Sequence, residues 1–214
     1  MSKRLILIRH GESLWNYENR FAGWANVPLT NLGIEQSKKA GSLLLRHNII
    51  PEVSYTSIQK RSIDTNKFIL KEMKIYNKIK IKNSWRLNER HYGKITGLHR
   101  ENLKWKGDYF DVPPNIRNSL KYESVYNNNY NPEFGESYYM TYLRVIPIWN
   151  TIKANFLNNN TILVCSHKNT IKVLIRHLEN LKEDKINNIE VENCLPHIYN
   201  FNGDLSIVNK LILK

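Results

Sequence analysis

Two histidines directly follow short apolar runs that are typical of buried strands. Arg9 and His10 come after the run at 5–8, and His167 comes after the run at 161–165. A neutral imidazole attacks phosphorus well at physiological pH, because an unperturbed pKa of about 6.5 leaves a ring lone pair free. The pair therefore predicts phosphoryl transfer, with one histidine as nucleophile and the second, if cationic, as a donor to the same oxygens.

Arg61 adds a third strand end to this pattern. It lies in the first turn of a predicted helix at 58–73, which follows a short predicted strand at 53–55. Guanidinium groups bind phosphoryl oxygens bidentately, and helix starts offer free amide donors. Taken alone, Arg61 suits a solvated helix face and either histidine suits a helix cap. Together they predict an anion pocket, because carboxyl ends of parallel strands share one edge of a sheet.

Strands and helices alternate along the chain, and this order must position the pocket. The alternation predicts a three-layer α/β/α fold with a mostly parallel central sheet and helices on both faces. The predicted strands are 5–8, 53–55, 79–81 and 161–165, with a terminal hairpin at 197–201 and 205–208. The predicted helices are 30–46, 58–73, 136–156 and 168–178.

Residues 83 to about 134 show neither helical nor strand periodicity in their apolar residues, and they contain a proline pair and an asparagine cluster. Long irregular segments in compact domains usually form lids or binding loops. We therefore predict a single domain over residues 1–214, with a substrate-loop insertion at about 83–134 that lies over the site.

The charge balance leaves three classes of partner open. The chain has 32 Lys and Arg against 19 Asp and Glu, a formal charge of +13, which suits nucleic acid, a membrane surface or an anionic small substrate. Lysines and asparagines are spread along the whole chain, so we expect no nucleic-acid face. Two cysteines form no disulfide framework, and no apolar run reaches the ~18 residues of a membrane span. We expect a soluble, cytoplasmic protein without membrane contact.

Five blocks occur in a fixed order between Leu5 and about Tyr199. They read LIRHGESLWNYENRFAGWANVPLTNLG, YTSIQKRSIDT, WRLNERHYGKITGL, GESYYMTYLRVIPIWN and VCSHKNTIKVLIRHL. Together they resemble the cofactor-dependent phosphoglycerate mutase family, within the histidine phosphatase superfamily. The resemblance implies that family's α/β/α fold, a small phosphorylated substrate, no metal, and a homodimer or homotetramer.

The resemblance also implies roles for particular residues. His10 is similar to the phosphorylated nucleophile, and Glu89 to the proton donor and acceptor, whose protonated form is favoured beside phosphate anions and low-dielectric walls. Arg9, Arg61 and His167 would complete the phosphate pocket. The implied substrate contacts are Asn16, Ala22, Gly23, Arg90, Tyr92, Arg100, Lys106, Lys168 and Asn169, with Gly23 letting the backbone approach the substrate.

Several positions depart from the family pattern. Lys106 stands near a family arginine pair, Ala22 replaces a threonine, and Lys168 replaces a glycine beside the second histidine. Arg100 keeps the charge of a family lysine. Mutases usually carry a further tail beyond the point where this sequence ends. The loss of one desolvated charge contact costs roughly 2–5 kcal/mol, so the bound intermediate would be retained less well. Weaker retention favours a phosphatase of small phosphorylated metabolites that uses no cofactor.

The alternative is a working mutase that interconverts 3- and 2-phosphoglycerate in glycolysis. It would be primed by 2,3-bisphosphoglycerate, and Lys168 would supply the missing charge. A third hypothesis, a non-enzymatic basic binding protein, explains the charge of +13. It does not explain why Arg9, His10, Arg61 and Glu89 occur together, so we favour an enzyme.

Overall fold

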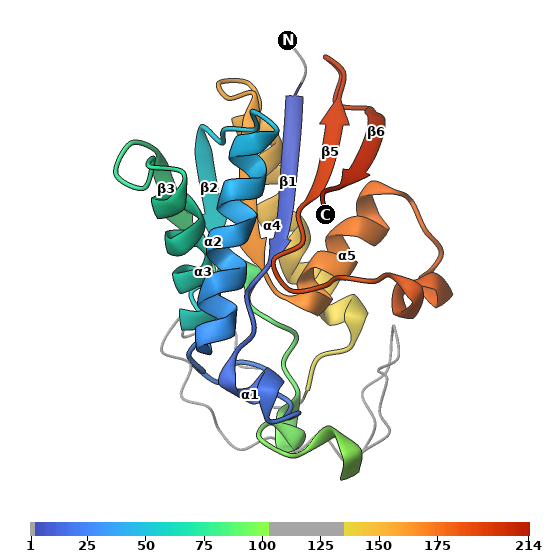
Figure 1. The fold of residues 1–214 in the computed structure, drawn as a ribbon. Coiled ribbons are helices and arrows are strands. Elements are labelled where there is room, and N and C mark those ends of the chain that lie inside the picture. Colours follow the sequence, from blue (N-terminus) through green and yellow to red (C-terminus); the bar gives the residue numbers. More distant parts are fainter. Residues whose placement is uncertain (1–2, 103–134) are drawn as a thin grey trace.

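Strand β1 (Lys3–Arg9) lies inside a six-stranded sheet with the order β3-β2-β4-β1-β5-β6 in the computed structural model (Figure 1). The structure describes residues 3–102 and 135–214. The β1–β4, β4–β2 and β2–β3 pairs are parallel, and β5 and β6 are added antiparallel. The remaining strands are β2 (Val53–Thr56), β3 (Lys80–Asn83), β4 (Thr161–Ser166), β5 (His197–Phe201) and β6 (Ile207–Ile212). The predicted mostly parallel sheet is confirmed.

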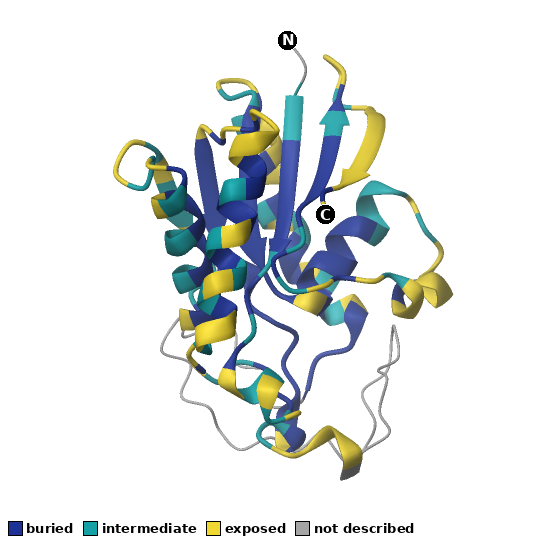
Figure 2. Ribbon diagram, in the orientation of Figure 1, coloured by how far each residue is buried: buried dark blue, intermediate teal, exposed yellow. Residues whose placement is uncertain are grey.

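Helices cover both faces of this sheet, which explains the unbroken apolar run in β1. Leu5 and Leu7 pack into the core beneath α4 and α5, whereas Ile6 and Ile8 pack beneath α2 and α3. A strand buried on both faces needs apolar residues at every position, and Figure 2 shows the central strands as buried. The long helices are α2 (Asn31–Arg46), α3 (Lys60–Glu72), α4 (Tyr138–Asn155) and α5 (Lys168–Leu178). The three-layer prediction is therefore correct.

Side-chain caps explain where two of the long helices begin. The Thr30 hydroxyl accepts the Gly33 amide at 3.0 Å before α2, and Ser137 accepts the Met140 amide at 3.1 Å before α4. Such caps satisfy backbone donors that have no partner within the helix. A short helix that the periodicity did not predict, α1 (Leu14–Tyr17), begins with a capping box.

The segment predicted to be aperiodic contains three short 3₁₀ helices in its described part. They are η1 (Trp85–Leu87), η2 (Gly93–Ile95) and η3 (Arg100–Asn102), and η5 (Glu183–Asn188) occurs later in the chain. Lys106 and the rest of 103–134 lie outside the described residues.

The terminal hairpin exists, but β6 begins later than the sequence predicted. Leu205 adopts a φ of 65° and its amide donates to the Asn202 carbonyl at 3.2 Å, so the turn extends through it. Within the described ranges, no helix combines the length and apolar character needed to cross a membrane.

Candidate active site

Three strand ends bring the predicted catalytic residues together. In the parallel β1–β4 pair, Arg9 lies opposite Ser166, and the His10 amide donates to the Ser166 carbonyl at 2.9 Å. This register places the rings of His10 and His167 with their centroids 4.9 Å apart. The Arg61 Nε lies 3.3 Å from His10 Nε2. The predicted convergence of two histidines and Arg61 is what the structure shows.

The hydrogen bonds of His10 define its tautomer. Its Nδ1 lies 2.7 Å from the Gly11 carbonyl oxygen, which can only accept, so Nδ1 carries the hydrogen. The Nε2 atom therefore keeps its lone pair and accepts from Arg61. Burial, and then the charges of Arg61 and Arg9, hold the His10 pKa well below its usual value. His10 is thus a buried neutral imidazole with a nucleophilic nitrogen.

Gly11 is required because the loop after β1 touches the start of α2. A Cβ atom at Gly11 would lie 2.3 Å from the Gly33 carbonyl oxygen, a distance that no side chain tolerates. The Gly11 amide also donates to the Thr65 hydroxyl of α3 at 2.9 Å. These contacts hold the backbone carbonyl that orients His10.

Ser57 orients the second histidine. Its hydroxyl accepts the Gln59 amide at 3.2 Å and lies 2.8 Å from His167 Nε2. The Ser57 hydroxyl has no other acceptor among the described residues, so donation to Nε2 uses its hydrogen and favours a neutral His167 with the hydrogen on Nδ1. That Nδ1 is buried and has no hydrogen-bond partner among the described residues.

His167 is favoured as a neutral ring, which differs from the cationic donor considered from the sequence. Burial is the main reason that its pKa lies well below the usual value, followed by the charge of Arg61. A neutral His167 with hydrogen on Nδ1 still offers one donor, so a hydrogen bond to a phosphoryl oxygen does not require the cation.

The Gly23 carbonyl holds Arg61 in place. The Gly23 carbonyl accepts from Arg61 Nη2 and from Gln59 Nε2, both at 2.8 Å, and Ala25 accepts from Arg61 Nη1 at 2.7 Å. Its φ of +47° favours glycine. Gly23 is not among the residues that line the cavity, so its expected backbone approach to substrate stays a prediction. Burial lowers the Arg61 pKa to about 10, so the guanidinium stays cationic near neutral pH.

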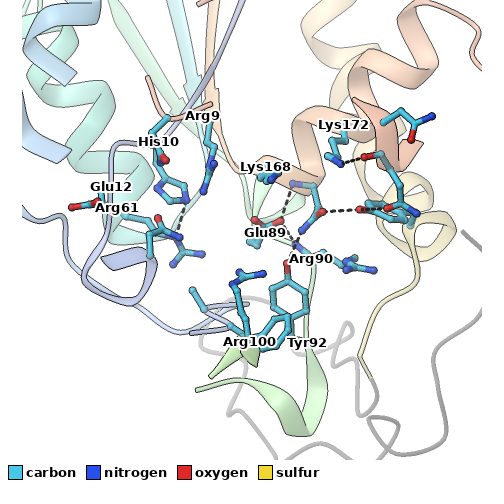
Figure 3. Close-up of a pocket in the computed structure, with 18 residues that line it drawn as sticks. Arg9, His10, Glu12, Arg61, Glu89, Arg90, Tyr92, Arg100, Lys168 and Lys172 are labelled. Atoms are coloured by element: carbon cyan, nitrogen blue, oxygen red, sulfur yellow. Dashed lines mark hydrogen bonds between the residues drawn. The ribbon is translucent and has the colours of Figure 1, made fainter. Parts of the chain in front are cut away.

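A cavity of about 650 Å³ opens beyond these residues (Figure 3). Among the described residues its charged lining is strongly cationic, with Glu12 and Glu89 as the carboxylates. The cations are Arg9, Arg61, Arg90, Arg100, Lys168 and Lys172. Such a lining suits an anionic ligand. The described residues contain no group of three or more histidine, cysteine, aspartate or glutamate side chains suited to hold a metal ion.

Most of the predicted substrate contacts line this cavity. They are Asn16, Ala22, Arg90, Tyr92, Arg100, Lys168 and Asn169. His167 is not a lining residue, but its ring packs against His10. Lys106 falls outside the described residues, so its predicted role stays a prediction.

Glu89 lies in the cavity wall with one carboxylate oxygen fixed. Its Oε1 accepts the backbone amides of Arg90 at 2.8 Å and Asn169 at 3.2 Å. The described residues give Oε2 no hydrogen-bond partner, and the side chain is 6% exposed. Glu89 therefore combines a fixed position with one oxygen available for proton exchange.

A buried ion pair holds the backbone around Glu89. Arg144 Nε lies 2.6 Å from Glu136 Oε1, and both side chains are almost fully buried. The Arg144 guanidinium also donates to the carbonyls of Arg86, Asn88 and Glu89, at 2.8, 3.0 and 2.9 Å. Arg144 thus positions the segment that carries the candidate acid.

Seven of the described residues that line the cavity were not identified from the sequence. They are Glu12, Phe21, Tyr138, Lys172, Asn187, Asn188 and Asn193. Lys172 carried a usable signal, because it lies four residues after Lys168 and so on the same face of the predicted helix. Asn187, Asn188 and Asn193 carried none, since asparagine is frequent throughout the chain.

Comparisons with known proteins agree with this geometry. The family model described as histidine phosphatase superfamily (branch 1) matches residues 5–212. A 2,3-bisphosphoglycerate-dependent phosphoglycerate mutase of Buchnera aphidicola is 36% identical over 99% of this chain and 98% of its own. A protein of the same name from Staphylococcus aureus is 35% identical over 98% of this chain and 99% of its own.

Solved structures share the fold at lower identity. A putative alpha-ribazole-5'-P phosphatase from Escherichia coli aligns with a TM-score of 0.76 and 22% identity, over 99% of this chain and 96% of that chain. A mycobacterial glucosyl-3-phosphoglycerate phosphatase in complex with VO3 aligns with a TM-score of 0.75 and 19% identity, over 98% and 97% of the two chains. At these identities the likeness concerns the fold alone.

Proposed function

The chain belongs to branch 1 of the histidine phosphatase superfamily, and we propose that it is a 2,3-bisphosphoglycerate-dependent mutase that interconverts 3- and 2-phosphoglycerate. The observation that carries the chemistry is His10 Nε2, a neutral nucleophile beside Arg61 in a cavity that the described residues line with six cations. Relatives that match nearly the whole chain carry the mutase name. These relatives favour the mutase, which was the alternative from the sequence, over the phosphatase that the sequence favoured.

In the proposed first half-reaction, His10 Nε2 attacks the phosphorus of a bound phosphate ester. A P–N bond forms, the bond between phosphorus and the ester oxygen breaks, and protonated Glu89 gives its proton to the leaving oxygen. Arg9, Arg61 and the His167 Nδ1–H stabilise the charge on the three non-bridging oxygens. The products are phosphorylated His10 and a free hydroxyl.

In the second half-reaction, a hydroxyl of the bound phosphoglycerate attacks the phosphoryl group on His10. The P–N bond breaks, Glu89 takes the hydroxyl proton, and His10 returns to its neutral form. Bound 2,3-bisphosphoglycerate supplies the phosphoryl group that first loads His10. The cationic lining fits such a polyanion, with Arg9, Arg61, Arg90 and Arg100 as candidate contacts.

Hydrolysis is the second candidate function. Ala22 places a methyl group in the cavity wall, and the exposed Lys168 lines the same cavity. Both positions depart from the mutase pattern on the substrate side. A phosphatase would use the same first half-reaction, with water as the acceptor in the second.

Labelling and turnover test both candidates. With labelled 2,3-bisphosphoglycerate, we expect an acid-labile, alkali-stable phosphate on the wild type, none on His10→Ala, and normal labelling on His47→Ala, which changes an exposed histidine. Mutase flux should exceed hydrolysis by orders of magnitude. Hydrolysis at or above the mutase rate would establish the second candidate, and a wild type that accepts phosphate from no donor would exclude both.

A further inference from the structure

Two lysines on one face of α5 line the cavity away from the histidines. Lys168 and Lys172 are four residues apart, so they are neighbours on the helix surface. Both also line an adjoining hollow of about 650 Å³. Figure 3 shows His10 and Arg61 toward one side of the cavity, Glu89 and Lys168 between, and Lys172 and Arg90 toward the other.

Lys172 is an unusual lysine because it is almost fully buried. It is 5% exposed, and its Nζ donates to the Asn187 carbonyl at 3.0 Å, its single partner among the described residues. An ammonium group has three donors, so two remain for a ligand. Burial, followed by the charges of Lys168 and Arg90, lowers the Lys172 pKa to about 8.

Lys168 has no hydrogen bond or ion pair within the described part of the chain. Its pKa is lowered by partial burial and then by the charges of Arg9 and Arg100. Glu89 and Glu190 act in the opposite direction on both lysines. Neither carboxylate forms an ion pair with them, and the fixed oxygen of Glu89 is already bonded to two amides.

The two lysines therefore lie in an environment with excess positive charge and unused donors. A bound anion would relieve the repulsion between them and complete their hydrogen bonds. The phosphoryl group to be transferred must lie at His10, on the other side of Glu89. A ligand that reaches both places must carry a second anionic group.

We propose that Lys168 and Lys172 form a subsite for the second anionic group of the substrate, and so select phosphorylated three-carbon carboxylates or bisphosphates over phosphate esters with a neutral tail. This inference rests on the proposed function and deepens it. It gives Lys168 a role as a specificity residue at the position where the family pattern has no side chain.

A matched pair of ligands tests the subsite. 3-Phosphoglycerate and glycerol 3-phosphate share a three-carbon skeleton and a phosphate, but only the first carries a carboxylate. Calorimetric binding is measured in a His10→Ala background, where no phosphoryl group is transferred. Lys168→Gln should weaken 3-phosphoglycerate binding about tenfold, the value of one charge-assisted contact, and change glycerol 3-phosphate binding less than about twofold.

Further variants separate charge from structure. Lys168→Arg should retain most of the affinity, and Lys182→Gln, an exposed lysine outside the cavity, should leave both ligands unaffected. Lys172→Met should also lose selectivity for 3-phosphoglycerate over glycerol 3-phosphate. Because this substitution removes the contact with Asn187 as well, the result for Lys168→Gln decides whether the lysines form the subsite. Equal losses for both ligands, or no loss for 3-phosphoglycerate, would overturn the proposal. Because His10 labelling is measured separately with His10 intact, failure of the subsite and failure of the proposed function are distinguishable.

Discussion

The two histidines of the site are held in complementary states by single hydrogen bonds. The Gly11 carbonyl puts the His10 hydrogen on Nδ1, and donation from the Ser57 hydroxyl to Nε2 favours the His167 hydrogen on Nδ1 as well. The first arrangement leaves a lone pair for attack, and the second leaves a donor for the oxygens that are attacked. Identical side chains therefore have different roles because their partners differ in whether they accept or donate.

Ser57→Ala should lower turnover by removing the donor that fixes the His167 tautomer. We expect kcat to fall about tenfold, the effect of weakening one preorganised donor by about 1.4 kcal/mol, while the affinity for substrate changes little. Nitrogen NMR should show His167 shifting from the Nδ1–H form toward a mixture of tautomers. As a control, His10 should keep its Nδ1–H signal, since Gly11 is untouched. A normal kcat with an unchanged His167 tautomer would refute the role given to Ser57.

The elements of the fold supply positions that side chains alone could not. Parallel pairing of β1 with β4 sets Arg9 opposite Ser166, and this register decides how closely His10 and His167 approach. The segment at 86–91, in contrast, has little regular structure of its own. It is held by the Arg144–Glu136 pair of α4 and its N-terminal turn.

Arg144→Met should therefore affect both stability and activity. Removing one partner of a buried ion pair leaves the other charge uncompensated and costs about 3–5 kcal/mol, which urea denaturation would measure. The carbonyls of Arg86, Asn88 and Glu89 also lose the Arg144 guanidinium, although Thr170 still donates to the Asn88 carbonyl and Trp24 to the Glu89 carbonyl. We expect kcat to fall as the segment that carries Glu89 moves.

The double variant Glu136→Gln/Arg144→Met separates these two effects. It should recover part of the lost stability, because no buried carboxylate remains unpaired. It should not recover kcat, since the guanidinium that bridges the carbonyls of Arg86, Asn88 and Glu89 is still missing. Full recovery of kcat in the double variant would show that Arg144 does not position Glu89.

The sequence predicted those features that depend on local pattern. Apolar runs located β1 and β4, and residues directly after strand ends located His10, His167 and Arg61. The position of Tyr138 in the cavity depends on how α4 and α5 pack together, which no local pattern encodes, whereas the spacing of Lys172 from Lys168 was a local signal that was not used. The contact of Gly23 with Arg61 was not predicted for a similar reason, because it crosses 38 residues of sequence.

At the scale of the whole molecule, the fold buries several histidines as neutral rings. His10 and His167 have pKa values well below the usual range, and burial lowers those of His91 and His197 to about 4. The unfolded chain binds these protons near pH 6.5. Between about pH 4 and 6.5 the unfolded state therefore holds more protons, and stability rises with pH. The full stability is present above pH 6.5 and is lost as the pH falls toward 4.

His197 allows this dependence to be tested without touching the site. It begins β5 between Leu7 and Ile212, is 1% exposed, and neither ring nitrogen has a hydrogen-bond partner among the described residues. His197→Leu removes a buried polar group and one proton-binding group of the unfolded state. The free energy of unfolding, measured by urea denaturation, should therefore rise from wild type to variant by more at pH 5 than at pH 8. The extra gain is up to about 1.4 kcal/mol for each pH unit below 6.5. The exposed His47→Leu serves as the control. An equal change at both pH values would mean that His197 is not a neutral buried ring, and that the acid sensitivity of the fold has another source.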